Sequence, residues 1–221
     1  YVLISQKDAA AAGITNPESK TRYANVTANG KTVKLPVLIQ PGLAQGVLAV
    51  AIGYGRTKAG KVADGIGANV YPMVSMTNGS LNFSVAEAKF ELLNEDYQIA
   101  QTQTHHTYMG RQTVIREFVS NDVKENPEIL TKSFAPKVAT WLDEDHQVKP
   151  GELSMWKGHD YKNHHWGMAI DLNTCTGCAA CVVACNVENN VALVGREEVI
   201  NRREMHWLRI DRYYSSDAEV T

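Results

Sequence analysis

The feature that most constrains this chain is a run of four cysteines within eleven residues. With the spacing C-x2-C-x2-C-x3-C, they are Cys175, Cys178, Cys181 and Cys185. No cysteine precedes them, so a framework of dispersed disulfides does not explain the pattern. Thiolates two residues apart on a tight loop can turn toward one inorganic cluster, and the small residues between them let the backbone approach its sulfide. The spacing predicts an iron–sulfur site.

Zinc is the alternative for a cysteine cluster. Zinc commonly takes two pairs of ligands separated by a dozen or more residues, so a single tight run favours iron and sulfur. In bacterial ferredoxins with this spacing, the fourth cysteine ligates the other cluster of a pair. The ligands still missing then have to come from elsewhere, because the chain has only four cysteines. The apolar start at Tyr1 also suggests a piece of a longer polypeptide.

Local signals near the N-terminus predict one helix and one hairpin. Ser5 and Asp8 have the spacing of a capping box, and Gly13 closes the alanine-rich stretch that follows. Asn29-Gly30 lies between two strand-like runs, which is a strong hairpin signal.

Short apolar runs separated by turn residues predict an α+β, β-rich fold. We expect strands at residues 1–4, 23–27, 32–37, 47–51 and 98–106, then 167–172 and 206–211, with a helix at 179–188. The short strands and frequent turns favour a barrel for residues 1–119. Residues 120–165 are polar and are expected to form a connector, and residues 166–221 a second domain that holds the cysteines.

Charge and motif content exclude several functions. The net charge is −2 and no lysine or arginine run is present, so nucleic acid is not an expected partner. No stretch of about 20 mostly apolar residues predicts a membrane span. The sequence offers no catalytic residue set, and the glycines at 53, 55, 65 and 67 fit turns better than a phosphate cradle.

Five segments carry a family resemblance. Residues 171–190 (DLNTCTGCAACVVACNVENN), with 206–214, resemble the first cysteine motif of the multi-cluster ferredoxin subunits that serve molybdopterin oxidoreductases. Residues 37–56 resemble the double-psi β-barrel domain at the C-terminus of those oxidoreductases. Together with residues 102–111 and 164–171, this order of parts is similar to the iron–sulfur subunit of alternative complex III.

The resemblance implies a double-psi β-barrel-like domain followed by the start of a ferredoxin-like domain. It implies an electron carrier without molybdenum, in a membrane-bound quinol:electron-acceptor oxidoreductase on the periplasmic side of the bacterial inner membrane. Its partners would be quinol-oxidising integral membrane subunits and multihaem cytochrome c subunits that lead to cytochrome c or a terminal oxidase. The full protein would hold [4Fe-4S] clusters and a [3Fe-4S] cluster.

By the same analogy, three of the cysteines would share one [4Fe-4S] cluster with a distant cysteine, and Cys185 would ligate the neighbouring cluster. Two other functions stay open. One is a molybdopterin-dependent oxidoreductase that uses the barrel, and the other is a zinc-stapled interaction module.

Overall fold

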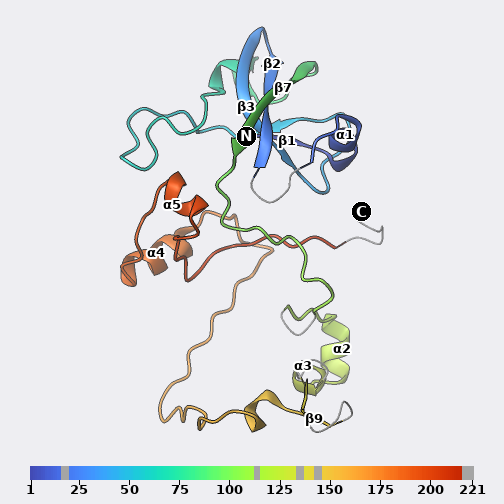
Figure 1. Ribbon diagram of the computed structural model, residues 1–221, viewed down its shortest axis with the longest axis vertical. Helices are drawn as coiled ribbons and strands as arrows, with labels where there is room; N and C mark the ends of the chain where they lie inside the picture. Colours follow the sequence, from blue (N-terminus) through green and yellow to red (C-terminus); the bar gives the residue numbers. More distant parts are fainter. Residues whose placement is uncertain (16–19, 112–114, 133–136, 142–145, 216–221) are drawn as a thin grey trace. The chain divides into compact units, whose positions relative to one another are not determined.

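The computed structural model divides the chain into two compact units. It describes residues 1–15, 20–111, 115–132, 137–141 and 146–215. The first unit combines Tyr1–Thr104 with Ala180–Tyr214, and the second contains the described residues between His105 and Ala179 (Figure 1). The predicted domain boundaries at residues 119 and 165 stay predictions.

A mixed five-stranded sheet forms the centre of the first unit, in the order β4-β1-β3-β2-β7. Its strands are β1 (Val2–Ile4), β2 (Lys20–Ala28), β3 (Lys31–Ile39), β4 (Ala49–Val50) and β7 (Ala88–Gln98). β1 pairs in parallel with β3 and antiparallel with β4, and β2 pairs antiparallel with both β3 and β7. The strand-rich, mixed character expected from the sequence is confirmed.

The local predictions near the N-terminus are also confirmed. Asn29 and Gly30 join β2 to β3 with φ of 49° and 69°, the two left-handed positions that a tight hairpin turn requires. Helix α1 (Gln6–Ala11) begins after Ser5, whose hydroxyl oxygen accepts a hydrogen bond of 3.1 Å from the backbone N–H of Asp8. Gly13 follows the helix with φ of 64°.

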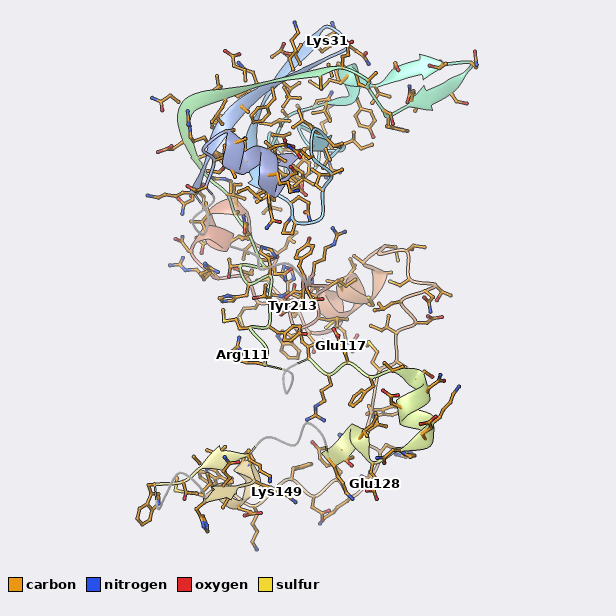
Figure 2. The ribbon with its side chains drawn as sticks, turned by 90° about the vertical axis from the view of Figure 1, so that its right-hand side faces the viewer. Lys31, Arg111, Glu117, Glu128, Lys149 and Tyr213 are labelled. Carbon is orange, nitrogen blue, oxygen red and sulfur yellow. The ribbon has the colours of Figure 1, made fainter. Side chains whose placement is uncertain are left out.

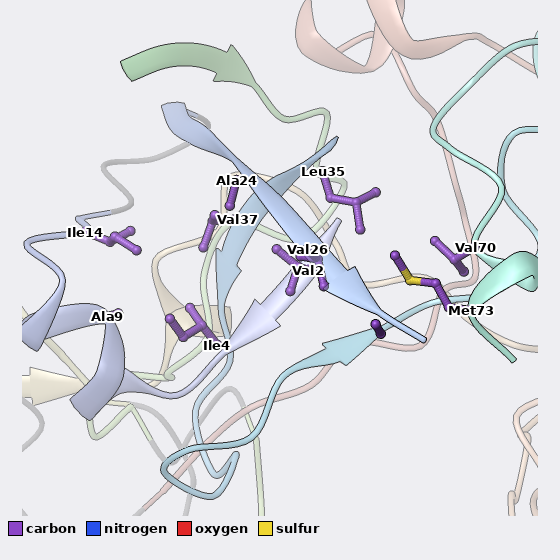
Figure 3. Packing of buried hydrophobic residues seen from close by; sticks show 11 residues of the cluster. Val2, Ile4, Ala9, Ile14, Ala24, Val26, Leu35, Val37, Val70 and Met73 are labelled. Atoms are coloured by element: carbon purple, nitrogen blue, oxygen red, sulfur yellow. The ribbon is translucent and has the colours of Figure 1, made fainter. Parts of the chain in front are cut away.

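One hydrophobic core lies against this sheet (Figure 3). Val2, Val26 and Val37 are completely or almost completely buried and come from three neighbouring strands. Along β2 the buried side chains alternate with partly exposed ones, as expected when one face of a strand packs on a core. Ala9 and Ile14 are buried in the same cluster, so α1 and the segment after it cover part of the sheet.

The strand expected at residues 98–106 is wrong. The strand in this region is β7, which ends at Gln98, and no regular structure follows it up to His106. The segment ELLNED within β7 is rich in residues that favour helices, so the sequence pattern does not indicate a strand there. Tertiary pairing with β2 outweighs that local preference.

The rest of the first unit is made of short elements. They are η1 (Tyr71–Met73), β5 (Ser75–Thr77), β6 (Ser80–Asn82), α4 (Ala180–Glu188) and α5 (Arg196–Ile200). Helix α4 confirms the helix expected from residue 179. The strand expected at 206–211 is wrong, because an alternating pattern makes a strand only where a neighbouring backbone pairs with it, and this segment forms no ladder with the described residues.

The second unit has little regular structure. It contains α2 (Ser120–Glu125), α3 (Ile129–Lys132), η2 (Pro150–Glu152) and the paired strands β8 (Val138–Ala139) and β9 (Gln147–Val148). Glu128 and Lys149, labelled in Figure 2, are both exposed. The strand expected at 167–172 is wrong: these residues are all exposed, and none of them pairs with a described strand. No helix among the described residues is long and apolar enough to cross a bilayer.

Candidate metal centre

The four cysteines lie on a loop and on the helix that follows it. Cys175 and Cys178 belong to the loop, and Cys181 and Cys185 belong to α4. All four carry free thiols; Cys185 is half-buried and the others are exposed. The sequence therefore predicted correctly that the fourth cysteine falls on a helix.

A turn centred on Asp171 fixes the start of the loop. The Asp171 carboxylate accepts a 3.0 Å hydrogen bond from the backbone N–H of Asn173. Its carbonyl oxygen accepts two more, from the N–H of Thr174 at 3.2 Å and of Cys175 at 3.0 Å. An aspartate that bonds to the backbone two residues on makes a tight turn, so Asp171 sets the backbone direction at the first cysteine.

The loop between the cysteines has two left-handed residues and backbone N–H groups that remain available as donors. Gly177 and Ala179 have φ of 70° and 60°, and a Cβ on Gly177 would meet nothing within 4 Å. The backbone N–H groups of residues 176–179 donate to no group among the described residues. Free N–H groups next to cysteines can donate to cluster sulfur, which fits an iron–sulfur ligand loop.

Helix α4 presents two thiols from one face. Cys181 and Cys185 are four residues apart, so their Cβ atoms start from the same side of the helix, one turn apart. This arrangement leaves open whether they bind the same cluster, and the division of ligands between two clusters stays a prediction.

The helix stops sharply just after Cys185. Asn190 is left-handed with φ of 49°, and its N–H donates to the carbonyl of Val187 at 3.3 Å. The N–H of Val191 donates to the carbonyl of Asn186 at 2.9 Å. This pair of bonds is a Schellman motif, which an asparagine in the left-handed region tolerates.

Asn189, at the same helix end, contacts Cys185 with its side chain. The amide nitrogen of Asn189 lies 2.9 Å from the Cys185 carbonyl oxygen and 3.6 Å from its Sγ atom. Neither Asn189 nor Asp171 was identified as a functional residue from the sequence. The available signal was the placement of Asp171 four residues before the first cysteine and of Asn189 four residues after the last, where turns and helix ends are expected.

Across the described residues, no group of three or more histidine, cysteine, aspartate and glutamate side chains is placed to hold a metal ion. The assignment of the four cysteines as candidate ligands therefore rests on their residue type and spacing. The convergence of the four thiols on clusters stays a prediction.

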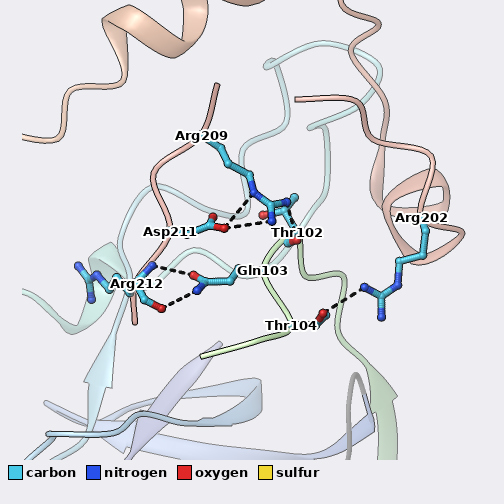
Figure 4. Close-up of polar contacts among 7 residues, drawn as sticks. All are labelled: Thr102, Gln103, Thr104, Arg202, Arg209, Asp211 and Arg212. Carbon is cyan, nitrogen blue, oxygen red and sulfur yellow. Dashed lines mark hydrogen bonds and ion pairs between the residues drawn. The ribbon is translucent and has the colours of Figure 1, made fainter. Parts of the chain in front are cut away.

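The segment after α4 is tied to the strand region of the same unit through arginines and one glutamine (Figure 4). Arg209 donates to the Thr102 carbonyl at 2.8 Å and pairs with Asp211. The side-chain amide of Gln103 exchanges two hydrogen bonds with the backbone of Arg212, at 2.5 and 2.8 Å. The segment that follows the cysteine helix is therefore held by contacts more than 100 residues apart in sequence.

Residues 166–187 match the family model described as a 4Fe-4S binding domain. The chain carries a 4Fe-4S binding domain. Its motif contains the four cysteines at 175–185, as the spacing predicted.

Two curated proteins show which subunits the iron–sulfur region resembles. The chain is 50% identical over 44 residues to the menaquinone reductase iron–sulfur cluster-binding subunit of Nitratidesulfovibrio vulgaris, which is 20% of this chain and 16% of that protein. It is 60% identical over 25 residues to the arsenate respiratory reductase iron–sulfur subunit ArrB of Chrysiogenes arsenatis, which is 11% of this chain and 83% of that sequence. The chain thus resembles iron–sulfur subunits of respiratory reductases, and the aligned region is about a sixth of the menaquinone reductase subunit.

The donor set fits an iron–sulfur cluster. Four free thiols are the ligand type that such clusters take, and the loop N–H groups that meet no acceptor among the described residues can donate hydrogen bonds to cluster sulfur. When bound, the cluster supplies one-electron transfer. The chain would contribute thiolate ligands, hydrogen bonds to sulfur and partial burial of Cys185, which together set how easily an electron is accepted.

Proposed function

We propose that this chain is an electron-transfer subunit of a membrane-bound quinol:electron-acceptor oxidoreductase of the alternative complex III type. It relays electrons one at a time through iron–sulfur clusters toward c-type haems, and then to cytochrome c or a terminal oxidase. The chain carries electrons and does not itself hold the catalytic site for quinol.

The observation that carries this proposal is the four-cysteine motif inside the 4Fe-4S binding domain. Two further observations support it. One similar protein is named as the iron–sulfur cluster-binding subunit of a menaquinone reductase, and the other as the iron–sulfur subunit of an arsenate respiratory reductase. A strand-rich region with a five-stranded mixed sheet precedes the motif, as expected if a strand-rich region stands ahead of the iron–sulfur region in the sequence.

The partners and location follow from the same proposal. Quinol-oxidising integral membrane subunits would supply electrons, and multihaem cytochrome c subunits would accept them on the periplasmic side of the inner membrane. Besides [4Fe-4S] clusters, the full protein would hold a [3Fe-4S] cluster. The double-psi β-barrel-like region would serve as a scaffold without molybdenum.

Metal analysis combined with low-temperature electron paramagnetic resonance tests the proposal on the purified native assembly. We expect iron and acid-labile sulfide, cluster signals after reduction with dithionite, and no molybdenum or tungsten. Addition of quinol should then reduce the clusters, and this reduction should stop when the membrane subunits are removed.

Two results would contradict the proposal in different ways. Molybdenum or tungsten at one atom per complex would favour a molybdopterin-dependent oxidoreductase that uses the strand-rich region. Stoichiometric zinc with no paramagnetic signal would favour a zinc-stapled interaction module.

A further inference from the structure

A side-chain amide lies against the last cysteine of the motif. The amide nitrogen of Asn189 is 3.6 Å from the Sγ atom of Cys185, within the range of a hydrogen bond to sulfur. The same nitrogen donates to the Cys185 carbonyl oxygen at 2.9 Å. A primary amide has two N–H bonds, so one donor can serve the carbonyl while the other serves the sulfur.

The acceptors decide which way this amide is oriented. The carbonyl oxygen of Cys185 can only accept a hydrogen bond, and a cysteine thiolate that ligates iron can only accept one as well. If the amide were turned over, its oxygen would face two acceptors. The nitrogen is therefore the atom directed at Cys185 when the cysteine is a ligand.

The helix end holds this amide in place. The backbone N–H of Asn189 donates to the Cys185 carbonyl at 3.1 Å, and the Schellman bonds made by Asn190 and Val191 fix the turn that follows. The side chain therefore projects from a backbone whose direction is set on both sides, and it reaches the sulfur four residues back along the helix.

We propose that the Asn189 amide donates an N–H···S hydrogen bond to the Cys185 thiolate and thereby raises the reduction potential of the cluster that Cys185 ligates. This inference rests on the proposed function, since it requires a bound cluster. A hydrogen bond to a ligating sulfur stabilises negative charge there, and the reduced cluster carries one more electron than the oxidised cluster. The bond therefore strengthens on reduction and favours the reduced form.

The size of the effect follows from exposure. Cys185 is half-buried, but Asn189 is exposed, so water takes over part of the hydrogen bonding when the amide is removed. We expect the equilibrium between reduced and oxidised cluster to change by about three- to tenfold, and a tenfold change corresponds to about 59 mV for a one-electron couple.

The test is potentiometry followed by electron paramagnetic resonance on the intact protein in its native assembly. Asn189→Leu, which is close to asparagine in size but lacks the donors, should move one cluster to a more negative potential and leave the others unchanged. Asn189→Gln keeps an amide and should recover part of the difference. Asn190→Gly is the matched control, because it keeps the left-handed helix end and leaves Asn189 in place; its potentials should be unchanged.

The outcomes separate this inference from the proposed function. Full iron content in Asn189→Leu with all potentials unchanged, or an equal shift in Asn190→Gly, would overturn the inference alone. If the Asn189→Leu protein contains too little iron, Asn189→Asp, whose side chain has the same shape, is measured instead. An unchanged cluster potential in that variant would also contradict the inference. Loss of iron in both variants would assign Asn189 a purely structural role, and an unsubstituted protein without any cluster would refute the proposed function as well.

Discussion

The guanidinium of Arg196 lies 4.8 Å from the centre of the Tyr97 ring and donates a hydrogen bond of 2.9 Å to the Tyr97 hydroxyl. A second nitrogen of Arg196 donates to the carbonyl of Gln98 at 2.5 Å. These contacts join α5, in the segment that follows the cysteine helix, to the end of β7. Together with the bonds of Arg209 and Gln103, they explain why two segments distant in sequence form one compact unit.

Replacing Arg196 should therefore loosen this connection. Lysine keeps the charge but cannot donate to the hydroxyl and the carbonyl in the same planar geometry, so Arg196→Lys should lower the free energy of unfolding by about 1 kcal/mol, and Arg196→Leu by about 1–2 kcal/mol. Urea denaturation followed by circular dichroism measures both. Arg203→Lys is the control: its side chain is 67% exposed and pairs with nearby Glu198, whereas that of Arg196 is 26% exposed. Equal losses at the two positions would contradict this account.

Two glycines with nearly the same backbone angle test whether the glycine-rich segment is shaped by close packing. Gly55 and Gly65 have φ of 71° and 70°, but only at Gly55 would a Cβ meet the backbone, with the carbonyl carbon of Ala68 at 2.6 Å. Gly65→Ala should lower the free energy of unfolding by about 1–2 kcal/mol from backbone strain alone. Gly55→Ala should be worse by several kcal/mol, because the backbone of residues 68 and 69 must also move.

Thermal unfolding of the two variants decides the question. Similar melting temperatures would show that positive φ alone explains both glycines. A much lower melting temperature for Gly55→Ala supports the interpretation of these residues as turn glycines in a packed fold.

Acid should remove one specific interaction near the N-terminus. The backbone N–H of Gly46 and the hydroxyl of Ser5 both donate to the Asp8 carboxylate at 2.7 Å, and they hold the pKa of Asp8 below its usual value. A carboxylate whose pKa is lower in the folded state stabilises the fold above the unfolded pKa of about 3.9, and this stabilisation is lost as the pH falls through the folded pKa.

Asp8→Asn tests this pH dependence. Asparagine keeps an acceptor oxygen for both donors but does not titrate, so the variant should lose less stability than the unsubstituted protein as the pH falls below about 4. Urea midpoints measured at pH 7, 5, 4 and 3 give the comparison. Parallel curves for the two proteins would show that Asp8 contributes nothing to acid unfolding.

Sequence patterns predicted the structural features that depend on residues close together in the sequence. The turn at Asn29-Gly30, the helix cap at Ser5 and the helix after Cys178 all follow from interactions within a few residues, and all are confirmed. The strand β7 was missed because its helix-favouring residues become a strand only through pairing with β2, whose paired residues lie 60 or more positions earlier. The same limit explains the incorrect strand at residues 206–211, since no local pattern shows whether a neighbouring backbone is present.

For the candidate site, the ligand residues followed from spacing, whereas their supporting contacts did not. Four cysteines within eleven residues predict an iron–sulfur site from the sequence alone. The contact between Asn189 and Cys185 depends on where α4 ends, and the turn at Asp171 depends on which backbone groups its side chain reaches. Both contacts depend on the folded backbone, which the spacing of the residues does not determine.

Single cysteine replacements can test how the ligands divide between clusters. If Cys178 serves one cluster and Cys185 its neighbour, as expected from the ferredoxin-type spacing, Cys178→Ser and Cys185→Ser should each alter a different paramagnetic signal in the reduced protein. Serine keeps the size of the side chain but ligates iron through oxygen, so the affected cluster should shift to a more negative potential or lose an iron. Iron content and difference spectra at several potentials measure this. Cys181 and Cys185 share one face of α4, so they can also bind the same cluster. If Cys178→Ser and Cys185→Ser change the same signal, the loop and the helix bind a single cluster.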